Sequence, residues 1–239
     1  MSTMARSLDL RCSHILCKVH DIRSAVADFT AAGFTVTWGS APDKAHNALI
    51  WFESGPFIEL FELPERFGLL SLPFGLVNGA PAGRRLARWA AGGEGWRDVA
   101  LETDDTELIG AHRALRESGI PGSRVMKGRR STPDGSRVRY QFLTPAPARL
   151  PFVVSQYDPP QRPAAVSHPN GALGVARVRF GVARQDREAF DTLAGTDRRL
   201  AAEPADRTGV RAVRLAGLEH EIHPADVHGA VFERSPGCS

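Results

Sequence analysis

The sequence has little lysine, and the scarcity bears on the partners that the protein can have. Lysine occurs only at Lys18, Lys44 and Lys127, so arginine supplies nearly all of the positive charge. The formal net charge is +3, and the pI is about 9.0. The arginines are scattered, without the aromatic interleaving or the single basic helix that is typical of a nucleic-acid-binding surface. We therefore expect no nucleic-acid partner.

Long apolar runs and paired cysteines are also missing. No stretch approaches the roughly 20 apolar residues of a transmembrane helix, and residues 1–7 lack the apolar segment of a signal peptide. Cysteine occurs three times, and Cys12 and Cys17 lie on opposite faces of one predicted strand, where they cannot bridge each other. These features predict a cytoplasmic protein without a membrane partner.

The sequence repeats an order of strand, helix and further strands. The first unit begins with a strand over residues 10–19, followed by a helix that starts after Asp21, a favourable N-cap, and ends at Gly33. Strands that end near Leu60 complete this unit. The second unit repeats the order, with strands predicted over 96–102, 137–142 and 151–157 and helical spacing at Leu108, Ala111 and Leu115.

A weaker third unit follows a proline-rich joint at residues 158–163. It offers a strand at 174–182, a short helix at 187–193, and strands at 209–215 and 218–223. Residues 64–93 interrupt the first two units and carry many apolar residues, including a predicted helix at 81–91. Such a segment is either a surface connector or a lid or oligomer contact.

His14 and Glu59 are the polar residues that most need an explanation. Each lies in the middle of a predicted strand, among apolar neighbours; Phe57 and Phe61 share the face of Glu59. A carboxylate between aromatic rings must be paired, bind a metal or raise its pKa. An imidazole and a carboxylate on facing strands form half of a metal site. A hydrogen-bonded pair inside a core is the alternative.

Several segments together resemble the glyoxalase-like branch of the vicinal oxygen chelate (glyoxalase/bleomycin resistance/extradiol dioxygenase) superfamily. The resemblance covers roughly residues 8–223 and depends on the order and spacing of residues 13–21, 25–29, 33–36, 47–52, 57–60, 132–135, 151–152 and 168–172. It implies an α+β fold in which repeated βαβββ modules form a half-open mixed β-barrel with helices on the outside.

The resemblance also implies a division of the chain. Residues 8–158 are expected to form the barrel of two paired modules, with 64–93 as a connector or lid. Residues 164–234 are expected to form a third, degenerate βαβββ-like module packed on the barrel. Because modules pair, this third module either covers the back of the first barrel or pairs with its copy in a homodimer.

Metal ligands in this superfamily come from the first and last strands of each module. The resemblance therefore implies His14 and Glu59 as ligands, with Glu59 also acting as the general base when it dissociates. In the second module Asp98 aligns with His14. The last strand offers Ser155, or Gln156 if the register slips by one residue, and Gln156 suits a hard cation. We expect one divalent ion, with manganese, iron, nickel and zinc not distinguished.

The predicted ligand is a small molecule, and the candidate binding residues are Arg137, Arg139, Phe57, Phe61 and Trp96. The expected function is that of a glyoxalase-like protein acting on a small oxygenated metabolite. Its chemistry would be metal-assisted lyase, isomerase or ring-opening chemistry. Two alternatives stay open: a metal-free protein that sequesters a drug-like ligand, and a metal-free enzyme using the same pocket.

Overall fold

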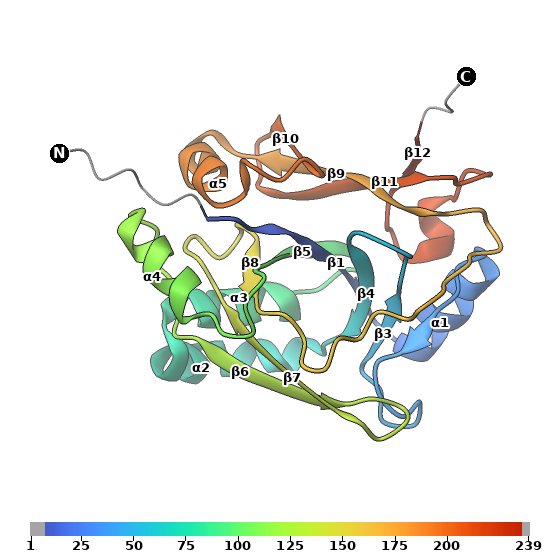
Figure 1. Ribbon diagram of the computed structural model, residues 1–239, viewed down its shortest axis with the longest axis horizontal. Helices are drawn as coiled ribbons and strands as arrows, with labels where there is room; N and C mark the ends of the chain where they lie inside the picture. The colour runs from blue at the N-terminus through green and yellow to red at the C-terminus, as the bar shows by residue number, and fades with distance from the viewer. Residues whose placement is uncertain (1–7, 236–239) are drawn as a thin grey trace.

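A curled sheet of eight strands holds the first two-thirds of the chain (Figure 1). The computed structural model describes residues 8–235, and Cys238 lies outside them. The strands of this sheet are β1 (Arg11–Val19), β2 (Thr37–Trp38), β3 (Asn47–Ile50), β4 (Phe57–Glu62), β5 (Gly95–Glu102), β6 (Met126–Ser131), β7 (Arg137–Leu143) and β8 (Phe152–Val154).

The spatial order of the strands shows two modules joined side by side. The order is β2-β3-β4-β1-β5-β8-β7-β6. In each half the first strand pairs in parallel with the last, β1 with β4 and β5 with β8, and the halves meet where β1 pairs antiparallel with β5. The predicted α+β fold of repeated modules in a half-open barrel is thereby confirmed.

The helix of each module follows its first strand. The first is α1 (Ile22–Ala31), and the side chain of Asp21 caps it by accepting a hydrogen bond from the Ser24 N–H at 2.6 Å. Gly33, at φ +83°, follows the end of this helix as predicted. The helix of the second module is α4 (Ile109–Glu117).

The two faces of β1 serve different purposes. Ile15 and Cys17 belong to a large apolar core that also contains Val178 and Phe180 of a second sheet. His14, Leu16 and Lys18 alternate with them and face the concave side of the barrel. The second sheet thus covers the convex side and leaves the concave side for a site.

The second sheet is built from β9 (Gly174–Val182), β10 (Leu200–Pro204), β11 (Gly209–Ala216) and β12 (Phe232–Arg234). Its helical segments are η2 (Arg184–Asp186), α5 (Arg187–Ala194) and η3 (Pro224–Val227). The strand order β10-β9-β11-β12 differs from that of the modules, because the first strand is central. The expected strand at 218–223 is wrong: Gly217 (φ +74°) turns the chain, and Pro224 begins η3. The division into domains stays a prediction.

Residues 64–93 form three short helical segments, η1 (Glu65–Leu70), α2 (Ser71–Asn78) and α3 (Ala80–Ala90). The third of these packs into the concave side of the barrel. The buried Lys18 Nζ donates to the carbonyl oxygens of Ala90 and Ala91, at 2.9 and 2.5 Å, and so satisfies the C-terminal end of α3. Within residues 8–235 no helix combines the length and the apolar character needed to cross a membrane.

Candidate functional site

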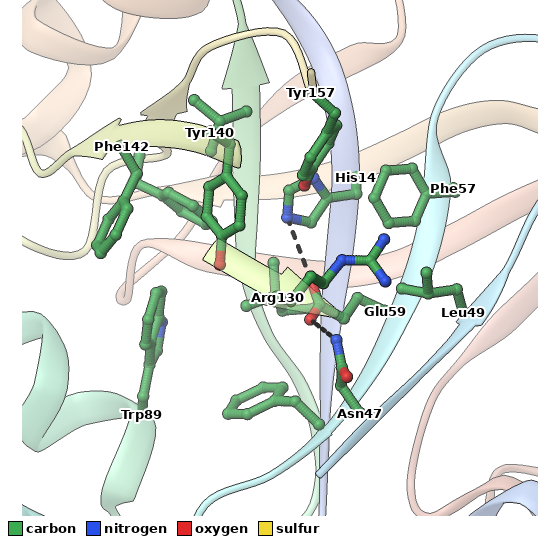
Figure 2. A pocket seen from close by; sticks show the side chains of 14 residues that line it. His14, Asn47, Leu49, Phe57, Glu59, Trp89, Arg130, Tyr140, Phe142 and Tyr157 are labelled. Atoms are coloured by element: carbon green, nitrogen blue, oxygen red, sulfur yellow. Dashed lines mark hydrogen bonds and ion pairs between the residues drawn. The ribbon is translucent and has the colours of Figure 1, made fainter. Parts of the chain in front are cut away.

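A cavity of about 170 Å³ opens on the concave side of the barrel (Figure 2). Its polar lining residues are His14, Asn47, Glu59, Arg130, Tyr140 and Tyr157. Its other lining residues are apolar or aromatic: Leu16, Leu49, Phe57, Phe61, Trp89, Phe142, Phe152 and Val154. An apolar pocket with a few convergent polar groups is the usual form of a small-molecule site.

A β-bulge aims His14 at this cavity. The pairing of β1 with β5 passes from Cys12–Leu101 to His14–Ala100, so Ser13 is an extra residue in β1. A bulge interrupts strict alternation. The Ser13 hydroxyl consequently lies 3.2 Å from His14 Nδ1 and donates to Glu102 Oε2 at 2.9 Å.

These two contacts fix the neutral tautomer of His14. The single hydroxyl proton of Ser13 goes to the Glu102 carboxylate, so the hydroxyl oxygen must accept the proton of His14 Nδ1. Nε2 then presents its lone pair to the cavity. Burial, with the charge of Arg130 as a second cause, lowers the pKa of His14 to about 3. The ring is therefore neutral at physiological pH.

Glu59 lies across from His14 on the neighbouring strand. Its Oε2 is 3.5 Å from His14 Nε2, and its Oε1 accepts a hydrogen bond from Asn47 Nδ2 at 2.8 Å. Burial raises the pKa of this carboxyl group, although the Asn47 hydrogen bond and the Arg130 charge oppose the shift. The raised pKa favours the protonated carboxyl group more than in an exposed glutamate.

Arg130 and two tyrosines face this pair from the other half of the barrel. Arg130 extends from β6, and its Nη1 donates to the carbonyl oxygen of Gly39 at 2.7 Å, which joins the two edges of the curled sheet. Burial raises the pKa of both Tyr140 and Tyr157, so both hydroxyls stay protonated and can donate. Gly128 is required because a Cβ there would lie 2.3 Å from the Tyr140 ring.

The candidate ligands of the second module lie elsewhere. Asp98 is fully buried, pairs with Arg85 of α3 and accepts a hydrogen bond from Trp89 Nε1 at 2.7 Å. Gln156 follows the end of β8 and lines a separate surface depression with Glu102 and Ser13. Neither residue lines the cavity that holds His14 and Glu59.

The candidate binding residues divide in a similar way. Phe57 and Phe61 line the cavity, and Phe57 stacks on His14 with 4.6 Å between ring centroids. Arg137 is exposed and Arg139 pairs with Asp158 on the outer face of β7, because Tyr140 takes the inward position. Trp96 packs on Phe232, because a second bulge, at Arg97, places it on the convex side.

The residues present do not fit a divalent metal of the kind that the superfamily holds. No group of three or more histidine, cysteine, aspartate or glutamate side chains suited to a metal occurs within residues 8–235. The second module contributes apolar side chains to the concave face, those of Ala100, Phe152 and Val154. A guanidinium beside His14 and Glu59 also disfavours a second cation there.

Sequence reasoning did not find Asn47, Arg130 or Tyr157 as site residues. The turn at residues 133–135 predicts a hairpin, and a hairpin requires a strand before the turn as well as after it. That inference predicts a strand at β6, but it does not show which arginine of the strand points inward. Residues 127–130 contain no alternation of apolar and polar side chains that would indicate the inward face.

Comparison with known proteins agrees with this architecture. The profile of a family described as a glyoxalase-like domain matches residues 12–194. A hypothetical protein from Staphylococcus aureus is 12% identical, with 95% of this chain and 99% of that chain covered and a TM-score of 0.66. The Mn(II)-bound glyoxalase from Novosphingobium aromaticivorans is 12% identical, with 86% and 65% covered and a TM-score of 0.51. Both likenesses concern the fold alone. No curated protein sequence matches the chain.

Proposed function

The chain belongs to the glyoxalase-like domain family of the vicinal oxygen chelate superfamily, and on that premise we propose that it catalyses proton transfer on a small oxygenated metabolite. The observation that carries the proposal is the pair at the cavity wall. A neutral imidazole with an outward lone pair faces a carboxyl group of raised pKa across 3.5 Å. Perturbed groups of this kind, converging in a pocket, are typical of catalytic sites.

The pair supports a balanced proton shift between adjacent carbons. His14 Nε2 takes a proton from the carbon next to a carbonyl group, while the carboxyl group of Glu59 gives its proton to the carbonyl oxygen. The product of this step is a neutral enediol. His14 then returns its proton to the other carbon while the Glu59 carboxylate takes the proton of that enediol's second hydroxyl group, which completes an isomerisation and restores both side chains. The aromatic walls limit access of water to the enediol.

A divalent metal at His14 and Glu59, which the family resemblance implied, is a second candidate. A neighbour of similar fold is Mn(II)-bound, but here two donors would have to suffice beside the charge of Arg130. The third candidate is a metal-free protein that only sequesters a ligand. Such a protein would bind the ligand without exchanging its carbon-bound protons. A homodimer is likewise a prediction that sedimentation can test.

Solvent exchange tests the proposal without knowledge of the full reaction. A panel of small 2-hydroxy aldehydes, ketones and acids is incubated in deuterium oxide, and loss of carbon-bound protons is followed by NMR. We expect exchange that survives EDTA and falls by about 10²–10⁴-fold in His14→Gln and Glu59→Gln. His20→Gln and Glu53→Gln, which change exposed residues, are the matched controls.

The outcomes separate the three candidates. Exchange that disappears with EDTA and returns with manganese would favour the metal. Ligand binding without any exchange would favour sequestration. Exchange that persists at full rate in both site variants would contradict the proposed roles of His14 and Glu59.

A further inference from the structure

Arg130 brings a positive charge into the cavity, and this charge acts on Glu59 although the two side chains form no ion pair. Its Nη1 is held by the neutral carbonyl oxygen of Gly39, and it forms no ion pair with any residue between 8 and 235. The nearest acid of the cavity, Glu59, is already engaged by Asn47 and faces His14. A partly buried charge without a counterion is costly unless a ligand supplies one.

Two further donors converge on the same space. In Figure 2 the hydroxyl ends of Tyr140 and Tyr157 point into the cavity. Neither hydroxyl is hydrogen-bonded to another side chain or to the backbone among residues 8–235. The rings of Tyr140 and Tyr157 pack against each other with 5.3 Å between their centroids, and Tyr157 also packs against Phe57. Packing therefore fixes the positions of both tyrosines. A guanidinium without an ion pair and two phenols without hydrogen-bond partners among residues 8–235 form a wall rich in donors.

The opposite wall holds groups that accept or exchange protons. His14 Nε2 offers a lone pair, and Glu59 offers a carboxyl group. The cavity volume of about 170 Å³ is comparable to the roughly 150 Å³ of an engineered cavity that binds benzene. The space therefore suits a molecule of a few carbon atoms.

We propose that this cavity recognises small carboxylates, with Arg130 as the residue that binds the carboxylate and Tyr140 and Tyr157 as supporting donors. The inference deepens the proposed function, on which it rests, by naming the class of substrate. A carboxylate on Arg130 would direct the neighbouring carbon of the ligand towards His14 and Glu59. Arginine is suited to this task because its fork can bind both carboxylate oxygens.

Binding measurements test the inference apart from turnover. Lactate and benzoate, each beside its neutral amide, are titrated into the full chain by calorimetry and followed by the fluorescence of Trp89 and the other tryptophans. We expect at least one acid to bind more tightly than its amide. Arg130→Gln should weaken that acid about 10- to 100-fold, the loss expected for one charge-assisted hydrogen-bonded contact. Arg130→Lys should weaken it less.

Arg129→Gln is the matched control, because Arg129 is the exposed neighbour on the same strand. It should leave binding unchanged, and thermal melting of each variant verifies that it folds. His14→Gln should still bind the acid, so loss of exchange with retained binding separates failure of the chemistry from failure of this inference. Equal binding of acid and amide, an unaffected Arg130→Gln, or no binding of either acid at millimolar concentration would overturn it.

Discussion

Burial of a neutral His14 should make the stability of the protein depend on pH in a defined window. In the folded protein the pKa of His14 is about 3, whereas an unfolded histidine titrates near 6.5. Below pH 6.5 the histidine of the unfolded state binds a proton, whereas His14 of the folded state does not. The free energy of unfolding therefore falls as pH falls towards 3. Between pH 7 and pH 5 the loss is about 2 kcal/mol, or roughly 4–8 °C in melting temperature for a chain of this size.

The assay compares urea unfolding of Glu59→Gln and of the double variant Glu59→Gln/His14→Gln at several pH values from 4 to 7. Glu59 opposes the trend, because its raised pKa gives the folded state a stability that is fully present below the unfolded pKa and is lost as pH rises through the folded pKa. The comparison is therefore made in a Glu59→Gln background. We expect the stability advantage of His14→Gln to grow by about 1.4 kcal/mol per pH unit below 6. Parallel pH profiles of the two proteins would refute the burial argument.

Two further predictions concern the groups around the site. Nitrogen-15 NMR of the histidine rings should show the proton of His14 on Nδ1, and Ser13→Ala should shift it towards Nε2; an Nε2 proton in wild type would contradict the assignment. Asp98→Asn leaves Arg85 buried without its counterion and should destabilise the fold by about 3–5 kcal/mol in a melting experiment. Asp158→Asn, whose exposed pair with Arg139 contributes at most about 1 kcal/mol, is the control, and equal losses would count against the buried pair.

Local patterns in the sequence were enough to predict the modules and the first-module half of the site. Strand alternation put Glu59 on one face with Phe57 and Phe61, and all three line the cavity. His14 lines the same cavity, but the bulge at Ser13 interrupts the alternation before it. Strand alternation predicted the wrong face for Trp96, because the bulge at Arg97 adds one residue to the strand. The residue types at this position do not indicate a bulge. Arg130 could not be predicted as a site residue, because its position in the cavity depends on the curling of the sheet, which brings β6 to Gly39.

The ion-pair partner of Asp98 could not be predicted from the sequence pattern either. The sequence aligned Asp98 with His14, but this alignment was wrong: His14 lies opposite Phe57, and Ala100 takes the equivalent place opposite Phe152. The side chain that pairs with Asp98 comes from α3, in an insertion that neither repeat contains. A long-range ion pair of this kind has no signature in the spacing of either segment. The same reasoning explains why the insertion was expected as a connector or lid, although α3 packs inside the barrel.

The helix α3 has one more consequence, which concerns the orientation of a ligand. Two similar modules alone would enclose a nearly symmetric space, in which a ligand could bind in either of two opposite orientations. Because Arg85 and Trp89 fill one side of that space, acid and base groups remain on one wall and donors on the other. A ligand would meet three different surfaces at once, so the insertion favours one of the two opposite orientations.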